Sequence, residues 1–560
     1  MKRRLLPLAA AVVAVALSLS GCGANQGGDS VTKSGWDVNE QPRDKVQDGG
    51  TFHGAFGSEI KTWNLSTAVG NDYEMRLMQS ALFENWIFED GVGNHTNNPN
   101  YISELKEEVK DGKLVLTMSI NPKAVWNDGA PITVKDWQRT VEVMSGTDDD
   151  YSIASSDGWD KIESVEQGKT AQDVVFTFKE TFPDWQTLFI GSPLRAESAV
   201  DADTFNDGWS TYKKEWYSGP YIVTDFESSS NTVTMERNPN WWGDKGKLDK
   251  IIWKYVSTDQ WPTAFANGEL DYIDIGQDAN AYAQVQNTPG AQIRRSSGPN
   301  YRHFTVNSKS GVLSDVNIRQ AIVMGLDRAA ITASDLAGLD VDTNLSQKNS
   351  NLYMQDQAGY TDWAEKTGIK FDQAGAKKKL EEAGYTMGSD GYYAKDGQTL
   401  TVRFAVLTGV PTSEGEGQLI LAQMKEIGVK IELQNLNTAT DWPGVLTDHK
   451  FDIIGFSWMG TAFPLANINQ LFGATSDSNY AQLDTPLVDE LTPKIAAEMD
   501  PAARQKLAQQ VDEALWKNVH TIPLYQRPAL AGVKANLANF GSFGLAQTPK
   551  TWVNVGYVAE

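Results

Sequence analysis

The feature that most constrains the fold is an alternation of strand-like and helix-like segments in the C-terminal third of the chain. Apolar runs at 400–407 and 429–433 are typical of buried strands, and residues 417–427 and 441–446 have helical spacing. A third apolar run follows at 451–456. Strands that alternate with helices pair in parallel through right-handed crossovers. The sequence therefore predicts an α/β fold built on a parallel sheet.

The third run ends unusually. Trp458, Gly460, Thr461 and Pro464 follow it, and a strand interior tolerates Gly and Pro poorly. In open α/β sheets, ligands bind where strands give way to loops at their carboxyl ends. One interpretation is therefore a wall of a ligand site. The other is a buried strand followed by an ordinary loop, which composition alone favours.

The N-terminus predicts export and attachment to a membrane. Three basic residues precede an apolar stretch at 5–19, which is typical of a secretory signal and short for a transmembrane helix. The stretch ends in Leu-Ser-Gly-Cys22, which matches a bacterial lipobox whose cysteine is acylated after cleavage. Cys22 is the only cysteine, so no intrachain disulfide forms. The alternative is a plain signal peptide with an incidental cysteine. Residues 23–49 have the polar composition of a flexible tether.

Composition excludes some classes of function. The chain has 560 residues, with 49 basic and 72 acidic side chains and a formal charge of −23, which argues against nucleic-acid binding. Its five histidines lack metal-ligand spacing, and no nucleophile elbow, phosphate loop or dinucleotide fingerprint occurs. We expect no metal, no cofactor and no enzyme activity, although spacing alone does not exclude a paired-carboxylate hydrolase. For the acidic run 148–150, a solvated loop is favoured over a cation site because EF-hand spacing is missing.

Local patterns predict several further elements. Helices are expected at 73–86, 316–330 and 372–383, a strand at 114–120, a hairpin from 162–165 and 174–178, and a late strand at 521–525. Thr133 precedes Asp136 by three residues, which predicts a capped helix start.

Five segments, in order along the chain, resemble one family. They are Trp-Asn-Asp-Gly-Ala-Pro-Ile-Thr at 126–133 with Asp136, Ser-Gly-Pro-Tyr at 218–221, Arg-Asn-Pro-Asn-Trp-Trp at 237–242, Val-Asn-Ile-Arg-Gln-Ala-Ile at 316–322 with Asp327-Arg328, and Thr-Ile-Pro-Leu at 521–524. Together they resemble the family 5 extracellular solute-binding proteins, which are the oligopeptide- and dipeptide-binding lipoproteins of ABC importers. Singly, only the first segment is specific.

The resemblance implies a two-lobed, periplasmic-binding-protein-like α/β fold of type II with an extra subdomain in the first lobe. The ligand would be enclosed between lobes that close by a hinge motion. The expected divisions are a signal peptide with lipobox at 1–22, a tether at 23–49, a first lobe at 50–66, 207–300 and 522–560, the extra subdomain at 67–206, and a second lobe at 301–521.

The resemblance also implies a ligand site. In this family a Trp-x-x-Asp-Tyr pattern lines the site and its Asp pairs with the amino terminus of a peptide. Here Trp458 matches, Thr461 replaces the acid, and the aromatic is displaced to Phe463. A threonine hydroxyl cannot neutralise an ammonium group, so either another acid anchors the amine or the ligand has no amine at this position. The expected ligand contacts are Phe56, Trp63, Asn64, Trp458, Met459, Gly460, Thr461, Phe463, Asn479 and Tyr480.

These features favour a monomeric binding protein, anchored through Cys22 on the extracellular face of the bacterial cell membrane, on the periplasmic side where an outer membrane exists. It would capture small peptides, or another oligomeric solute, and deliver them to an ABC permease in the membrane. The alternative within the binding class is an oligosaccharide or other neutral solute that stacks on Trp458 and Phe463. A secreted hydrolase or a cell-wall interaction protein on the same scaffold is the alternative of a different class.

Overall fold

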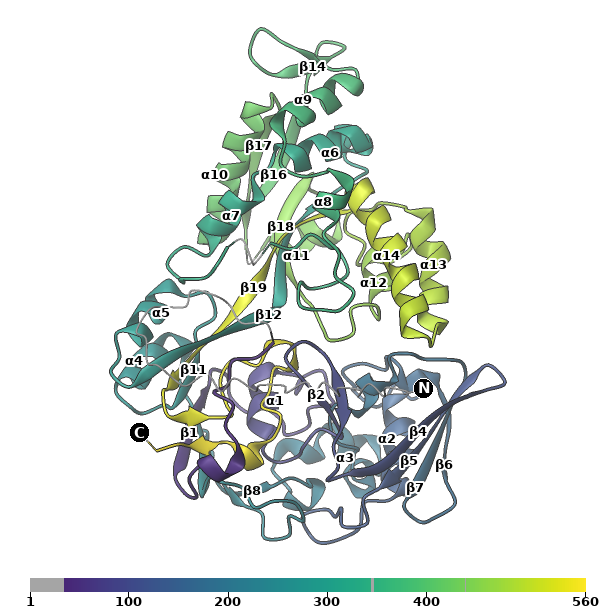
Figure 1. Cartoon of the computed structure of the whole chain (residues 1–560), viewed down its shortest axis with the longest axis vertical. Helices are drawn as coiled ribbons and strands as arrows, with labels where there is room; N and C mark the ends of the chain where they lie inside the picture. Colours follow the sequence, from purple (N-terminus) through teal and green to yellow (C-terminus); the bar gives the residue numbers. More distant parts are fainter. Residues whose placement is uncertain (1–34, 344–346, 439, 560) are drawn as a thin grey trace, which may run out of the picture. The chain divides into compact units, whose positions relative to one another are not determined.

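The computed structural model describes residues 35–343, 347–438 and 440–559 (Figure 1). The expected signal peptide, Cys22 and the first part of the expected tether lie outside these residues. A search of the described helices finds none that is both long enough and apolar enough to cross a membrane.

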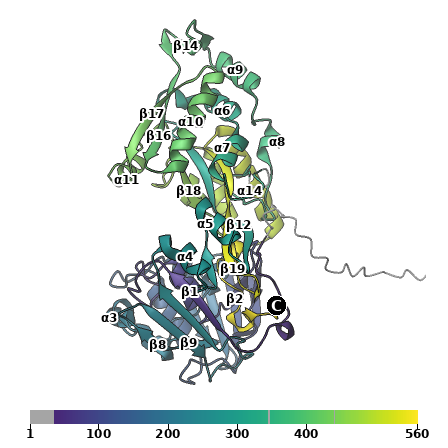
Figure 2. The same ribbon diagram turned by 90° about the vertical axis from the view of Figure 1, so that its left-hand side faces the viewer.

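The first lobe is built on a four-stranded sheet with the order β1-β10-β9-β8. Its strands are β1 (Thr51–Phe56), β8 (Tyr221–Glu227), β9 (Thr232–Arg237) and β10 (Lys250–Tyr255). β1 pairs in parallel with β10, whereas the other neighbours are antiparallel. Figure 2 labels β1, β8 and β9 of this sheet. Phe52 packs against Trp253, Phe540 and Trp552 at ring-centroid distances of 4.9–5.6 Å. This aromatic cluster fixes C-terminal residues onto the first strand.

A second antiparallel sheet, with the order β4-β5-β7-β6, forms most of the expected extra subdomain. Its strands are β4 (Ile102–Lys110), β5 (Lys113–Ile120), β6 (Ile162–Gln167) and β7 (Asp173–Phe178). On β5 every second side chain is buried, as its alternating sequence predicts. Helix α2 (Val134–Met144) packs on this sheet through Trp137, whose ring lies 5.5 Å from that of Phe176. The predicted capping box of Thr133 and Asp136 is present.

The second lobe contains the predicted parallel unit. Strands β16 (Thr401–Thr408), β17 (Lys430–Asn437) and β18 (Ile453–Met459) are parallel, and α10 (Pro411–Glu426) and α11 (Trp442–Thr447) connect them (Figure 1). Phe404 of β16 and Met424 of α10 belong to one apolar core. β18 extends through Trp458 to Met459, so the strand ends three residues after the apolar run at 451–456.

Two long strands belong to the sheet of the second lobe and continue toward the first. β12 (Ala291–Val306) and β19 (Thr521–Lys534) are antiparallel neighbours in a sheet ordered β11-β19-β12-β18-β16-β17. β19 also pairs with β11 (Tyr272–Asp274), and β12 pairs with β18. Each strand therefore crosses an expected lobe boundary. The β12–β19 pairing shifts register between Ser297 and Tyr301, which interrupts the ladder.

The remaining described helices are α1 (Tyr73–Gln79), α3 (Ala202–Asn206), α4 (Trp261–Ala266), α5 (Ala279–Gln286), α6 (Val316–Gly325), α7 (Arg328–Asp335), α8 (Trp363–Thr367), α9 (Gln373–Glu382), α12 (Ile468–Phe472), α13 (Pro486–Ala497) and α14 (Pro501–Asn518). Short strands are β2 (Ile87–Glu89), β3 (His95–Asn97), β13 (Thr386–Met387), β14 (Tyr393–Lys395), β15 (Gln398–Thr399), β20 (Leu537–Ala538) and β21 (Gly556–Tyr557). The turn 148–150 is exposed.

Two predicted helices are shorter than expected. α1 ends at Gln79 because the backbone of Gly219 packs against the next turn, where an added Cβ would lie 2.3 Å from the backbone of Leu82. The helix predicted at 316–330 divides in two. Asp327 accepts a hydrogen bond from the backbone N–H of Ala330 at 3.0 Å and starts α7 as its N-cap.

Residues 37–49, expected within the tether, pack onto the first lobe. Asp37 forms a bridge with Ser542, and Val38 and Val46 are buried. Arg294 of β12 is fully buried and donates to the carbonyl oxygens of Val38 and Phe540. The described part of the expected tether is therefore packed against the first lobe.

Candidate functional site

A cavity of about 470 Å³ is lined mainly by first-lobe residues and closed on one side by the loop that follows β18. This volume is within the range of roughly 300–1,000 Å³ found for ligand pockets. Several aromatic residues line it. They are Trp63, Phe83, Trp159, Trp209, Trp216, Tyr217 and Phe463.

Four of the expected ligand contacts line this cavity: Trp63, Asn64, Thr461 and Phe463. Trp63 packs edge-on against Phe226, with centroids 5.7 Å apart. The Asn64 amide donates to the carbonyl of Phe205 at 2.8 Å, which uses one of its donors and fixes its orientation. The structure thus brings together residues about 400 positions apart in the sequence.

The loop after β18 is held from the second lobe and touches the first. Gln357 donates to the carbonyl of Thr461 at 2.9 Å, and the Thr461 hydroxyl accepts from the N–H of Phe463 at 3.1 Å. The Phe463 ring stacks on His95 of β3, with centroids 4.5 Å apart and planes inclined by 22°. The loop thus joins the two lobes beside the cavity.

Other expected contacts lie elsewhere. Phe56 is fully buried in the first-lobe core and offers no surface to a ligand. Met459 is 59% exposed and lines a different cavity, of about 360 Å³, beside β12 and β19. The Asn479 amide donates to two backbone carbonyls, and its oxygen contacts His520 Nε2 at 2.8 Å, so the side chain is used internally. Gly460 precedes the lining loop but is not part of the wall.

Trp458 and Tyr480 also lie outside the cavity wall. Their rings are parallel within 4° at a centroid distance of 5.9 Å, and Trp458 is parallel to His303 within 5° at 6.2 Å. Both pack on the small core that contains Phe456. Trp458 therefore supports the strand from which the cavity loop departs.

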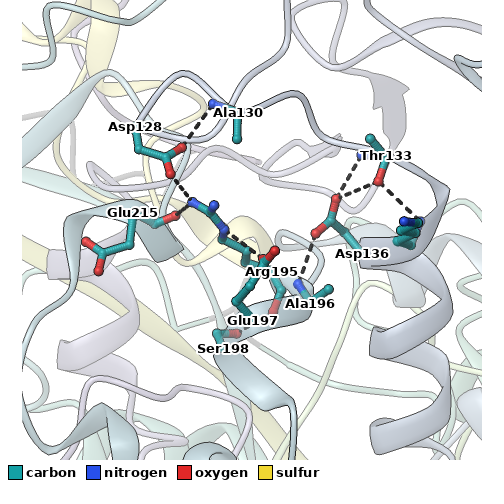
Figure 3. A network of polar contacts seen from close by, with 10 residues as sticks. Asp128, Ala130, Thr133, Asp136, Arg195, Ala196, Glu197, Ser198 and Glu215 are labelled. Atoms are coloured by element: carbon teal, nitrogen blue, oxygen red, sulfur yellow. Dashed lines mark hydrogen bonds and ion pairs between the residues drawn. The ribbon is translucent and has the colours of Figure 1, made fainter.

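The signature segment at 126–133, with Asp136, forms a network of polar contacts with Arg195 and Ala196 (Figure 3). Arg195 donates to Asp128 at 2.7 Å, and Asp136 accepts from the N–H of Ala196 at 3.0 Å. Burial raises the pKa of Asp136 from its ordinary value, and the hydrogen bonds it accepts offset part of that rise. Residues 192–194, which directly precede Arg195, line the cavity. The signature segment therefore does not line the cavity itself, but its contacts with Arg195 and Ala196 hold the lining residues 192–194 in place.

Among the lining residues that sequence reasoning missed are both charged ones, Arg76 of α1 and Glu89 of β2. Neither belongs to a motif, and only the fold brings them to one cavity. Burial lowers the pKa of Arg76, and the negative charge of Glu89 opposes that shift. Across the part of the chain that is described, no group of three or more His, Cys, Asp and Glu side chains is placed to hold a metal ion.

The protein has two lobes joined by two long paired strands, and residues of both lobes line one cavity. These features define the class of two-lobed periplasmic binding proteins. Residues 78–480 match the family described as bacterial extracellular solute-binding proteins, family 5. The oligopeptide-binding protein OppA of Mycobacterium tuberculosis (strain ATCC 25618 / H37Rv) is 30% identical over 519 residues, covering 92% of this chain and 86% of the relative.

Solved structures agree. The periplasmic EDTA-binding protein EppA superposes with a TM-score of 0.81 at 25% identity, covering 94% of this chain and 98% of that one. The oligopeptide-binding protein AppA from Bacillus subtilis, in complex with a nonapeptide, gives 0.65 at 18% identity, covering 92% and 100%. The chain belongs to family 5 of the bacterial extracellular solute-binding proteins, which are non-catalytic. It is an extracellular solute-binding protein of ABC import.

Proposed function

We propose that this protein captures peptides between its two lobes and delivers them to an ABC permease, while a lipid on Cys22 holds it to the outer face of the membrane. It acts as a monomer. The lipobox and basic N-terminus support the anchor. The relatives named as oligopeptide-binding proteins support the ligand class.

The observation that carries the proposal is the cavity itself. It combines aromatic rings with accessible neutral polar side chains, among them Asn71 and Gln547. Aromatic surface holds peptide side chains without strict selection, and amide groups bond the peptide backbone. Phe463 enters this wall from the second lobe, so a ligand here contacts both lobes.

A metal chelate is a second candidate, favoured by the likeness to the EDTA-binding protein EppA. A chelate with several carboxylates requires a positively charged site, whereas this wall holds one cation and one anion. An oligosaccharide that stacks on Trp458 is less favoured, because that ring lies outside the wall and packs beside His303 and Tyr480.

A binding screen separates these ligands. The mature protein is mixed in turn with a peptide pool, Fe(III)-EDTA and an oligosaccharide set, and its melting temperature is followed. A ligand that binds only the folded state raises the melting temperature as its concentration exceeds Kd. We expect a rise with peptides alone. A rise with the chelate or a glycan, and none with peptides, would show that the peptide assignment is wrong.

A further inference from the structure

Two opposite charges face the cavity in an otherwise neutral wall. Among the described lining residues, Arg76 and Glu89 are the charged ones. They come from different elements, α1 and β2, and their charges are close enough to influence each other. A wall that selects a neutral ligand, or one of a single charge, has no need of such a pair.

Arg76 is free to bind an anion. Its Nη2 donates to Asn71 Oδ1 at 3.2 Å, and no carboxylate within the described residues lies at ion-pair distance from it. Arg76 is an exposed residue that lines the cavity, and partial burial of its guanidinium lowers its pKa. A guanidinium in that setting binds a carboxylate through paired hydrogen bonds.

Glu89 is placed to bind a cation. Its side chain is 10% exposed, and its Oε2 contacts His95 Nε2 at 3.2 Å. Within the described residues its Oε1 accepts no hydrogen bond, and this oxygen is not among the buried atoms that lack a partner. A carboxylate accepts several hydrogen bonds, so Glu89 keeps capacity for an ammonium group while it holds His95.

Glu89 also connects to the second lobe. His95, which it orients, stacks on Phe463, and Phe463 lies two residues after Thr461. Thr461 is the position where the family resemblance implies an acid. Glu89 thus supplies a carboxylate to the same cavity from the first lobe, where Thr461 supplies none.

We propose that Glu89 and Arg76 bind the two ends of a short zwitterionic peptide, Glu89 the α-ammonium group and Arg76 the terminal carboxylate. This inference rests on the proposed peptide-binding function and specifies its substrate class as peptides with both ends free. Because one cavity holds both anchors, the peptide has only a few residues. Glu89 contacts His95, whose ring stacks on Phe463 at the contact between the lobes. Binding of the peptide ammonium group at Glu89 is therefore coupled to closure of the lobes.

The test uses a defined tripeptide mixture in three forms: unmodified, N-acetylated and C-amidated. Equilibrium dialysis against the mature protein, with mass spectrometry of the retained peptides, gives their relative affinities. The variants are Glu89→Gln and Arg76→Gln. Glu104→Gln and Lys106→Gln are matched controls, because this pair on β4 is more than half exposed and lies outside the cavity. Circular dichroism and melting curves confirm folding of each variant.

For the wild type we expect each modification to reduce affinity at least about tenfold, the usual cost of losing a charged hydrogen bond. N-acetylation should cost less than about twofold in Glu89→Gln, and C-amidation less than about twofold in Arg76→Gln. The controls should behave as wild type. If Glu89→Gln does not fold, Glu89→Asp is used and should retain part of the sensitivity to acetylation.

Two outcomes overturn the assignment while leaving peptide binding intact: equal binding of modified and unmodified tripeptides by the wild type, or unchanged sensitivity in the variants. Failure of every peptide, short or long, to bind the wild type instead overturns the proposed function itself.

Discussion

At the scale of single residues, Asp335, at the end of α7, is a largely buried acid outside the cavity. Tyr525 donates to it at 3.0 Å, and Glu416, which is paired with Arg302, lies beside it. Burial and the neighbouring Glu416 carboxylate raise the pKa of Asp335 to about 8. Arg527 of β19 also faces this group. Asp335 therefore keeps its proton in the folded protein under conditions where the unfolded chain has lost it.

This proton makes stability depend on pH. Between the ordinary pKa of an aspartate, 3.8, and about 8, the folded state binds one more proton than the unfolded state, so stability falls as pH rises through that window. Asp335→Asn carries no titrating group and should lack this decline. We expect the melting temperature of the wild type, relative to that of the variant, to fall from pH 5 to pH 8. A difference that is constant or rises with pH would contradict this prediction.

The residue at position 461 gives a second prediction at this scale. Thr461→Asp places an acid in the cavity where the family pattern has one. Because Glu89 already offers a carboxylate there, we expect no gain in affinity for unmodified tripeptides, measured by calorimetry. A gain of about tenfold would show that the ammonium group of the ligand reaches position 461. Thr461→Ser serves as the control.

At the scale of elements, the sequence predicted those features that depend on residues close together in the chain. The alternation of β5, the capping box of α2 and the parallel unit β16–β18 were readable because periodicity and side-chain caps act within a few residues. The end of α1 could not be predicted in this way, because the residue that approaches the turn after it, Gly219, comes from a distant part of the chain. Arg76 and Glu89 were missed for the same reason, since no spacing rule relates a helix residue to the end of a separate strand.

The division between α6 and α7 shows how one side chain sets an element boundary. Asp327 satisfies the N–H of Ala330 at 3.0 Å, an N-cap contact that alanine cannot make. Asp327→Ala should reduce the free energy of unfolding by about 1 kcal/mol, whereas Asp327→Asn, an equally good cap, should change it little. Chemical denaturation measures both. An equal loss in the two variants would indicate that the charge, and not the cap, stabilises α7.

At the scale of the whole molecule, a bidentate ion pair joins the lobes away from β12 and β19. Arg504 of α14 donates to Asp184 at 2.7 Å through Nη1 and again through Nη2, with side-chain exposures of 13% and 9%. Nearby, the Thr181 hydroxyl donates to the carbonyl of Ala497 at 2.7 Å. Hinge opening would separate these groups, so the contact favours the arrangement in which a ligand is enclosed.

We expect Arg504→Ala to weaken binding of unmodified tripeptides about tenfold, because an enclosed state of lower population reduces the apparent affinity in proportion. Asp184→Ala should have a similar effect, and the double variant should lose less than the sum of the two free-energy losses. Lys506→Ala, an exposed cation on the same helix, is the matched control. Affinities equal to wild type in both single variants would exclude a role for this pair in closure.

The paired strands β12 and β19 have a mechanical consequence. A two-stranded ribbon resists stretching and in-plane bending, because both would strain its ladder of hydrogen bonds, but it flexes and twists more easily out of its plane. We expect this ribbon to bend most easily at the register shift after Ser297, because the ladder of hydrogen bonds is interrupted there. The lobes are thereby restricted to few directions of movement. The lobes therefore sample few relative orientations before a ligand binds. Little of the binding free energy is then needed to bring the first-lobe and second-lobe walls of the site into alignment.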